Sequence, residues 1–168
     1  MITYVTSLKE LSVLAFFLDI THFPGLPDLP GINEEEAAFL TNNMNKEGML
    51  IIRGNNCSVD LALGFILKQL ANPKLIVIFN DGSFATCNNR LGSVVKVDNK
   101  NKNKFKITPL PTPEDMAEFF WEKDKLGEKE VLHLISDTDS TKILVSKEEL
   151  VQLLSVIYTA DHGFGGEK

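Results

Sequence analysis

The spacing of hydrophobic residues divides the chain into a helical first part and a β-rich middle. From residue 8, apolar residues recur every three or four positions, which predicts a helix that ends before the proline- and glycine-rich stretch THFPGLPDLPG. A second helix is expected from residue 34, with Gly48 as its stop. Ser7 with Glu10 and Asn33 with Glu36 have the spacing of capping boxes, which supports both helix starts.

The residues after Gly48 indicate a short strand, MLII, followed by a turn, RGNN. Ser58 is then expected to cap a third helix that carries Val59 and closes at ANP. A helix, a glycine stop and the first strand of a wing are typical of a winged helix-turn-helix. We therefore predict a winged-helix-like helical segment over residues 1–73.

After Pro73 the period of the pattern changes from about 3.6 to 2. The segments LIVIF, FATC, LGSVVKV and KFKIT read as strands of a small antiparallel meander. Asp81-Gly82 tolerates the positive φ of a tight hairpin turn between the first two strands, and the polar stretch DNKNKNK forms a loop between the last two.

The last third begins with a helix that Thr112 caps and Pro113 opens, with Met116, Phe119 and Phe120 on one face. EVLHLIS and TKILV predict a second hairpin, and Ser146 with Glu149 has the spacing of a third capping box. Together these elements predict an α+β protein. A winged-helix-like N-terminal half would pack on an antiparallel β-sheet with C-terminal helices, residues 74–168, in one compact unit.

Charge changes the functional interpretation of the winged-helix pattern. The chain has a formal net charge of −6, and residues 7–73 carry four basic and eight acidic side chains. Lys and Arg supply most of the non-specific affinity for DNA, and the helix that would enter the groove opens with Glu34, Glu35 and Glu36. The sequence therefore predicts no nucleic-acid partner, and a winged-helix transcription regulator is the least favoured function.

No motif supports catalysis or a cofactor. The chain lacks Gly-x-Ser-x-Gly, a phosphate loop and His-Glu-x-x-His, and Cys57 and Cys87 cannot form a zinc site by themselves. DTDSTKILVSKE resembles a calcium loop, but Lys142 stands where the EF-hand needs glycine. We expect a non-enzymatic protein without cofactor or metal. The lack of a signal peptide and of an apolar run of about 20 residues predicts a cytoplasmic protein that does not insert into membranes.

Protein binding is the remaining class of function. Phe119 and Trp121 are candidate exposed aromatic anchors, although ordinary core packing is the alternative, more so for Phe119. Residues 74–111 carry seven basic and two acidic side chains. An acidic partner could therefore bind there, and the solvated loop tip is the alternative. The candidate basic residues are Lys100, Lys102, Lys104 and Lys106.

The order of these segments resembles that of the EspG-type chaperones of type VII (ESX) secretion. The resemblance covers roughly residues 7–122 and follows the segments SLKELSVLAFFLDITHFPGLPDL, KEGMLI, LKQLANP, KLIVIF, LGSVVKV and FKITPLP. EspG proteins are longer, with a larger sheet and a C-terminal helical bundle, and none of their substrate-contacting residues can be placed on this chain.

The resemblance implies a cytoplasmic, non-enzymatic chaperone or adaptor that grips the apolar tip of a secreted helical hairpin. The alternative is an acidic immunity protein that neutralises a basic toxin, because residues 112–168 carry six basic and thirteen acidic side chains. The identity of the partner, the stoichiometry and self-association are left open by the sequence.

Overall fold

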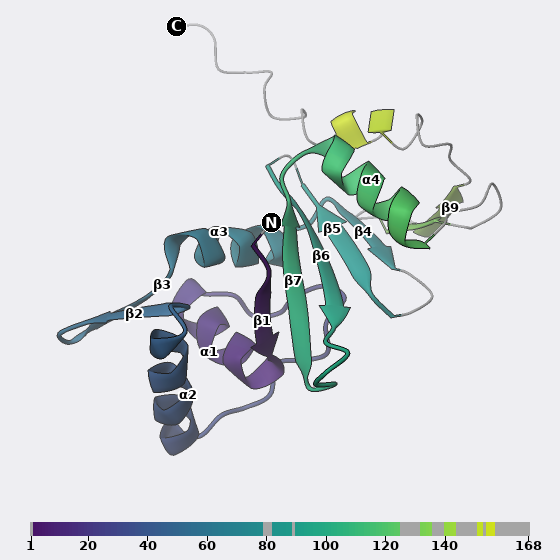
Figure 1. The fold of residues 1–168 in the computed structure, drawn as a ribbon. Coiled ribbons are helices and arrows are strands. Elements are labelled where there is room, and N and C mark those ends of the chain that lie inside the picture. Colours follow the sequence, from purple (N-terminus) through teal and green to yellow (C-terminus); the bar gives the residue numbers. More distant parts are fainter. Residues whose placement is uncertain are drawn as a thin grey trace, which may run out of the picture.

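The computed structural model describes residues 2–78, 82–88, 90–124, 132–135, 140–143, 151–152 and 154–156. It shows an α+β fold, as the hydrophobic pattern predicts. A seven-stranded sheet with the strand order β1-β7-β6-β5-β4-β8-β9 forms the centre, and every neighbouring pair is antiparallel. Helices lie on both faces of this sheet (Figure 1).

The first two helices begin where their caps predict. Helix α1 (Leu8–Leu18) has the complete Ser7–Glu10 capping box. In helix α2 (Glu34–Lys46) the Asn33 side chain accepts a hydrogen bond from the Glu36 amide, whereas the Glu36 carboxylate pairs with Lys9 of α1. The second box therefore keeps its cap, and its glutamate joins the two helices.

The region between α2 and the third helix differs from the prediction. Strands β2 (Leu50–Arg53) and β3 (Asn56–Val59) pair only with each other and form a hairpin that projects from the body of the molecule (Figure 1). Ser58 lies in β3 and caps no helix. Helix α3 (Leu61–Ala71) is capped by Asp60, whose carboxylate accepts from the Leu63 amide at 3.0 Å. The winged-helix character of this half stays a prediction.

The predicted meander is confirmed. It consists of β4 (Leu75–Ile78), β5 (Phe84–Cys87), β6 (Gly92–Val97) and β7 (Lys104–Leu110). Strand β1 (Tyr4–Ser7), which the pattern did not predict, pairs with β7 from Ser7↔Lys104 to Tyr4↔Ile107. Pro109 lies on β7 two residues beyond this pairing. Proline has no backbone N–H, so it cannot donate a further hydrogen bond between the two strands. The first segment of the chain thus contributes an edge strand to the sheet.

Helix α4 (Pro113–Asp124) begins at the expected proline, and the Thr112 hydroxyl accepts from the Asp115 amide at 3.0 Å. Strands β8 (Leu132–Ile135) and β9 (Ser140–Ile143) form the predicted second hairpin, and β8 continues the sheet beside β4. The third capping box, at Ser146, and the side chain of Phe120 lie outside the described residues.

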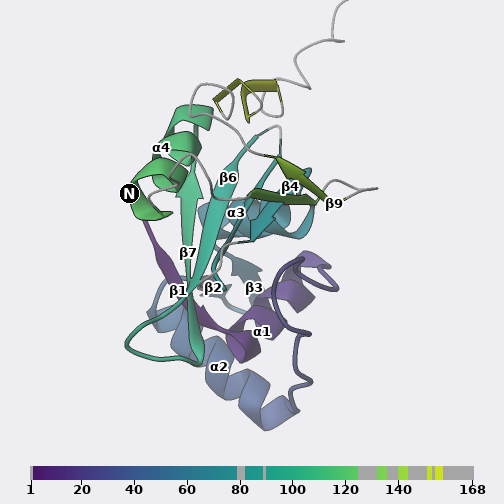
Figure 2. The same cartoon turned by 90° about the vertical axis from the view of Figure 1, so that its right-hand side faces the viewer.

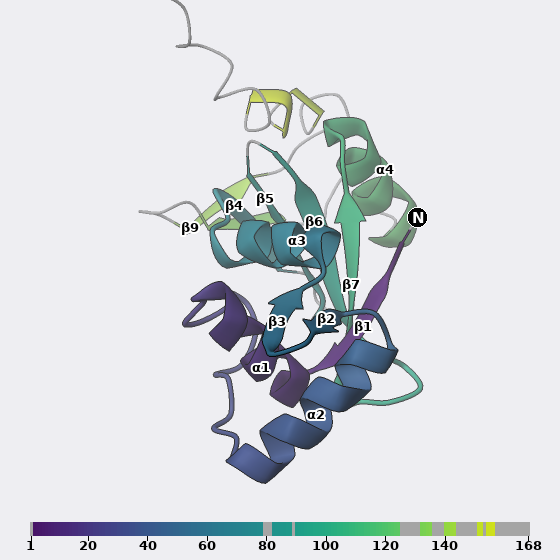
Figure 3. The ribbon, with the colours of Figure 1, turned by 90° about the vertical axis from the view of Figure 1, so that its left-hand side faces the viewer.

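Each face of the sheet has its own hydrophobic core. Helices α1 and α3 pack on one face around residues such as Leu14, Leu67 and Ile107, all 0% exposed. Helix α4 and the helical residues 151–152 and 154–156 cover the other face, where Met116 and Leu154 are also fully buried. Figure 2 shows α3 and α4 on opposite sides of the sheet. Figure 3 shows α3, the β2–β3 hairpin, α1 and α2 gathered on one side.

Candidate protein-binding surface

The four predicted lysines do not form one free cluster. Lys100 and Lys102 are exposed in the β6–β7 turn. The Lys104 ammonium lies 3.9 Å from the carboxylate of the buried Glu10. The Lys106 ammonium donates to the Asp98 carboxylate at 2.8 Å. Two of the four charges are thus already paired within the protein.

Asp98 is held in its charged form by this environment. The hydrogen bond from Lys106 and a second from the Lys100 amide lower the pKa of the Asp98 carboxyl below its ordinary value of 3.8. The turn that presents Lys100 and Lys102 is therefore fixed partly by a carboxylate at its base. A partner that binds this turn meets two exposed lysines outside the salt bridges, rather than four.

The two predicted aromatic anchors have different outcomes. Phe119 is half-buried against the core beneath α4, and the Lys96 ammonium lies 4.8 Å from the centre of its ring. The side chain of Trp121 lies outside the described residues. A binding role for these aromatic residues and the lysines stays a prediction.

Large exposed hydrophobic side chains gather elsewhere. Ten are exposed in the part of the chain that the structure describes, and seven of them belong to α1, α2, α3 and the β2–β3 hairpin. Singly exposed apolar residues are normal, but a concentration in one part of a molecule indicates an interaction surface. The seven are Phe16, Phe17, Phe39, Ile51, Ile52, Leu61 and Phe65.

A groove lies between α1 and α2, with a volume of about 380 Å³. We call it the α1–α2 groove. Phe16 is 79% exposed and forms an edge-to-face pair with Phe17, their ring centres 5.7 Å apart. The lining is mainly apolar and comes from both helices and from the end of their connecting loop: Ser12, Val13, Phe16, Phe17, Pro30, Ile32, Ala37 and Thr41.

The connecting loop is fixed against the helices and the sheet. Ser12 Oγ lies 2.9 Å from the carbonyl oxygen of Pro30 and 3.0 Å from that of Leu8, so its proton can bond either. In the middle of the loop, Gly25 adopts a φ of +87°, and its backbone rests against the ring of Phe84. The wall of the groove is therefore anchored in the core of the molecule.

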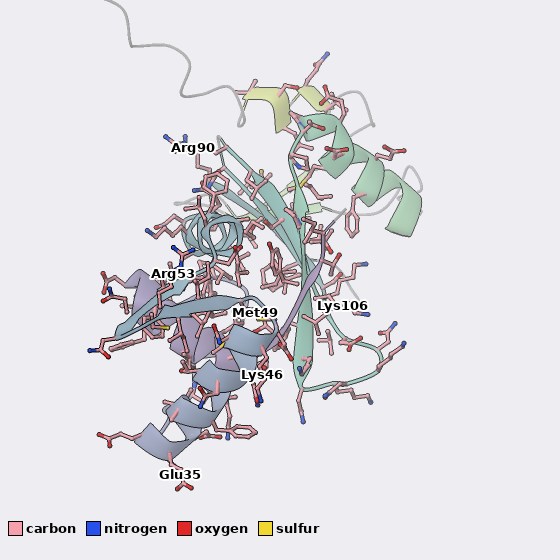
Figure 4. All side chains as sticks on the ribbon, turned by 60° about the vertical axis from the view of Figure 1, so that its left-hand side comes forward. Glu35, Lys46, Met49, Arg53, Arg90 and Lys106 are labelled. Carbon is pink, nitrogen blue, oxygen red and sulfur yellow. The ribbon has the colours of Figure 1, made fainter. Side chains whose placement is uncertain are left out.

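The segment of chain that builds the groove is acidic. Residues 8–41, which build it, contain six carboxylates and one basic side chain, Lys9. Lys9 already pairs with Glu36. Figure 4 shows Glu35 at the free end of α2, while Lys46 and Met49 lie at the end that meets the rest of the molecule. The segment that builds this apolar depression therefore carries an excess of negative charge.

A smaller recess of about 250 Å³ lies where the end of α1 meets α3. Leu18, Leu61 and Phe65 line it, and Leu61 is 87% exposed. Gly64 lies on α3 beside Leu18, and a Cβ at this position would meet the Leu18 side chain at an ordinary contact distance of 3.4 Å. The recess adds to the apolar surface of the N-terminal half.

One feature of the sequence indicated that apolar side chains of α1 would remain exposed. The run VLAFFL is apolar around the whole helix, and only part of such a helix can face a single core. Val13, Leu14 and Ala15 take the buried positions, so Phe16 and Phe17 at the end of α1 remain at the surface. The pattern shows that α1 has more apolar side chains than one core can bury. It does not show which of them stay exposed.

Neither a cluster of metal ligands nor a membrane-spanning helix occurs within the described ranges. There, no three His, Cys, Asp or Glu side chains lie together as metal ligands would. No helix among these residues has the length and apolar character needed to cross a bilayer.

No family model and no curated protein matches this sequence. Among solved structures, the chain is similar to the Mycobacterium tuberculosis type VII secretion system chaperone EspG5, solved in complex with a PE25–PPE41 dimer. The fold is EspG-like. The match has a TM-score of 0.50 and 15% sequence identity, and it covers 70% of this chain and 49% of that chain. The chain thus spans about half the length of EspG5, which agrees with the expected difference in size, and the likeness concerns the fold alone.

Proposed function

We propose that this protein is a cytoplasmic, non-enzymatic chaperone or adaptor that binds a helical-hairpin substrate of a type VII-like secretion system. The observation that carries the proposal is the shared fold with EspG5, a chaperone solved in complex with two other proteins. A fold by itself does not decide function, so the surface has to supply the second argument.

The surface favours protein binding over other functions. A chaperone for an apolar helix tip needs exposed apolar side chains on a stable scaffold, and the described residues provide them on α1, α2, α3 and the β2–β3 hairpin. A net charge of −6 keeps such a protein soluble despite this apolar surface. Self-association is also compatible with these features.

The test is affinity capture of the tagged protein from its own cells, with the co-purifying proteins identified by mass spectrometry. A small helical-hairpin secretion substrate in stoichiometric amount supports the proposal. A toxin whose activity is blocked in the complex would replace it with the immunity function. Retention on DNA at low salt, with no protein partner, would return the transcription regulator to consideration.

Variants at the predicted lysines then test where the substrate binds. Lys100→Glu combined with Lys102→Glu reverses two exposed charges without breaking a salt bridge of the described structure. Lys46→Glu with Lys74→Glu is the matched control, because both lysines are exposed, lie outside that turn and do not line the groove or the recess. We expect the first pair and Trp121→Ala to weaken capture and the control pair to leave it unchanged. Equal capture by all variants would remove this surface from the proposal.

A further inference from the structure

The α1–α2 groove has the shape of a receptor for a third helix. Two helices that pack side by side leave a furrow between their surfaces, and the ridge of another helix can fill it. The Lys9–Glu36 salt bridge and the Ser12–Pro30 contact fix its rims. A volume of about 380 Å³ accommodates a few large apolar side chains rather than a whole molecule. This is the geometry of helix-in-groove recognition, in which residues at i, i+3, i+4 and i+7 are the anchors.

The charges around the groove select the partner. Glu34, Ala37 and Thr41 follow one stripe of α2, so an exposed carboxylate stands at the end of the apolar lining. Neither Glu34 nor Glu35 takes part in a salt bridge within the described structure. The one basic side chain of residues 8–41, Lys9, is neutralised by Glu36. An acidic helix or an anionic membrane would be repelled here.

We propose that the α1–α2 groove binds an amphipathic helix of another protein, with large apolar side chains toward Phe16 and Phe17 and with Lys or Arg on its flanks. The apolar face fills the groove, and a basic flank lies near Glu34, at the end of the apolar lining. This inference does not rest on the proposed function. It concerns a surface of opposite charge to the Lys100–Lys106 segment and makes a separate prediction about the partner.

The probe is a fluorescent model peptide of about 18 residues, or five helical turns, with a leucine face and lysine flanks. Binding to the intact protein is measured by fluorescence anisotropy. We expect saturable binding that weakens as salt rises, because the flanking charges are at the rim of the site. The same peptide with glutamate in place of lysine is expected not to bind. Equal binding of the two peptides, or binding of neither, would overturn the proposal.

Two serine variants separate the groove from the other exposed apolar residues. Phe16→Ser removes a ring from the groove, whereas Leu61→Ser removes an equally exposed side chain that does not line it. These side chains are 79% and 87% exposed, so neither change removes core packing. We expect Phe16→Ser to weaken peptide binding about tenfold or more and Leu61→Ser to change it less than about twofold. Equal loss in both variants would mean unspecific adsorption and would refute the site.

A second pair of variants tests the charge argument. Glu34→Gln with Glu35→Gln removes two carboxylates from the first turn of α2, of which Glu34 continues the stripe of the groove lining. Glu47→Gln with Glu114→Gln removes two exposed carboxylates from the far end of α2 and from α4. We expect the first pair to weaken binding and to flatten its dependence on salt, with the second pair close to wild type. Equal effects of both pairs would show that only net charge matters, which contradicts a defined site.

Sedimentation of the protein alone completes the test. A monomer whose groove is free to bind the peptide agrees with a separate helical partner. A dimer that Phe16→Ser dissociates would show that a second copy occupies the groove, and the proposal of a basic amphipathic helix would then be wrong.

Discussion

Gly25 lies in the loop that forms one wall of the α1–α2 groove. Its replacement by alanine should lower the free energy of unfolding for two reasons. The backbone has a φ of +87°, where an L side chain is strained. An added Cβ would also lie 2.9 Å from Cδ2 and from Cε2 of Phe84. The Phe84 ring is 4% exposed and cannot move aside without disturbing its neighbours.

The magnitude follows from these two contributions. A left-handed conformation costs an alanine about 1–2 kcal/mol, and overpacking a filled core costs about 1–3 kcal/mol, so Gly25→Ala should lose about 2–5 kcal/mol of unfolding free energy. Gly48→Ala provides the strain alone, because Gly48 has a φ of +77° and no atom within 4 Å of its Cβ position. We expect it to lose about 1–2 kcal/mol.

A third variant supplies the baseline. Gly31 lies outside the positive-φ region and also has open space around its Cβ position. Gly31→Ala should therefore stay within about 1 kcal/mol of wild type, on the stabilising side, because alanine restricts the unfolded chain.

Urea denaturation followed by circular dichroism measures all three variants. With a slope of about 2 kcal/mol per molar urea, the midpoint of Gly25→Ala should fall by about 1–2.5 M. Equal midpoints for Gly25→Ala and Gly48→Ala would show that the contact with Phe84 adds nothing, and the anchoring of the groove wall in the core would be wrong.

Three further predictions concern a cap, a salt bridge and the cysteines. Asp60→Ala removes the cap of α3 and should cost about 1 kcal/mol, seen as a lower melting temperature. Because Lys106 lowers the folded-state pKa of Asp98, this carboxylate contributes stability above its ordinary pKa of 3.8, and the contribution is lost as pH falls through the lower folded value. Lys106→Met should raise the Asp98 pKa in an NMR titration, and an unchanged value would contradict the bond. Burial raises the pKa of Cys87 to about 12, so a thiol reagent should modify the half-buried Cys57 in the native protein and Cys87 only after unfolding.

Local patterns predicted most of the elements. Ser7, Asn33 and Thr112 each cap the helix that follows them, because a cap depends on a backbone amide only three residues away. The meander was predicted by short strand-like segments and turn residues for the same reason, since its strands pair with neighbours in the chain. The prediction that Ser58 caps α3 was wrong. Ser58 and Asp60 both have side chains that can cap a helix, and the pairing of β3 with β2 decides between them.

The candidate site shows the limit of such patterns. Lys104 and Lys106 looked as free as Lys100 and Lys102 in the sequence, although Asp98, the partner of Lys106, stands at the start of the same predicted hairpin loop. Glu10 reaches Lys104 only because β1 pairs with β7, and this pairing joins segments about a hundred residues apart. Long-range contacts of this kind are invisible to any pattern that spans one or two turns.

The sequence by itself determined the starts of α1, α2 and α4, the strands of the meander, the α+β class and the acidity of residues 8–41, since these depend on neighbouring residues or on composition alone. Only the tertiary structure decided which apolar side chains are buried. Leu14 and Phe16 belong to the same apolar helix, yet one is fully buried and the other 79% exposed. The difference arises because α3 and the sheet cover one side of α1, and the side toward α2 and its loop remains an open groove.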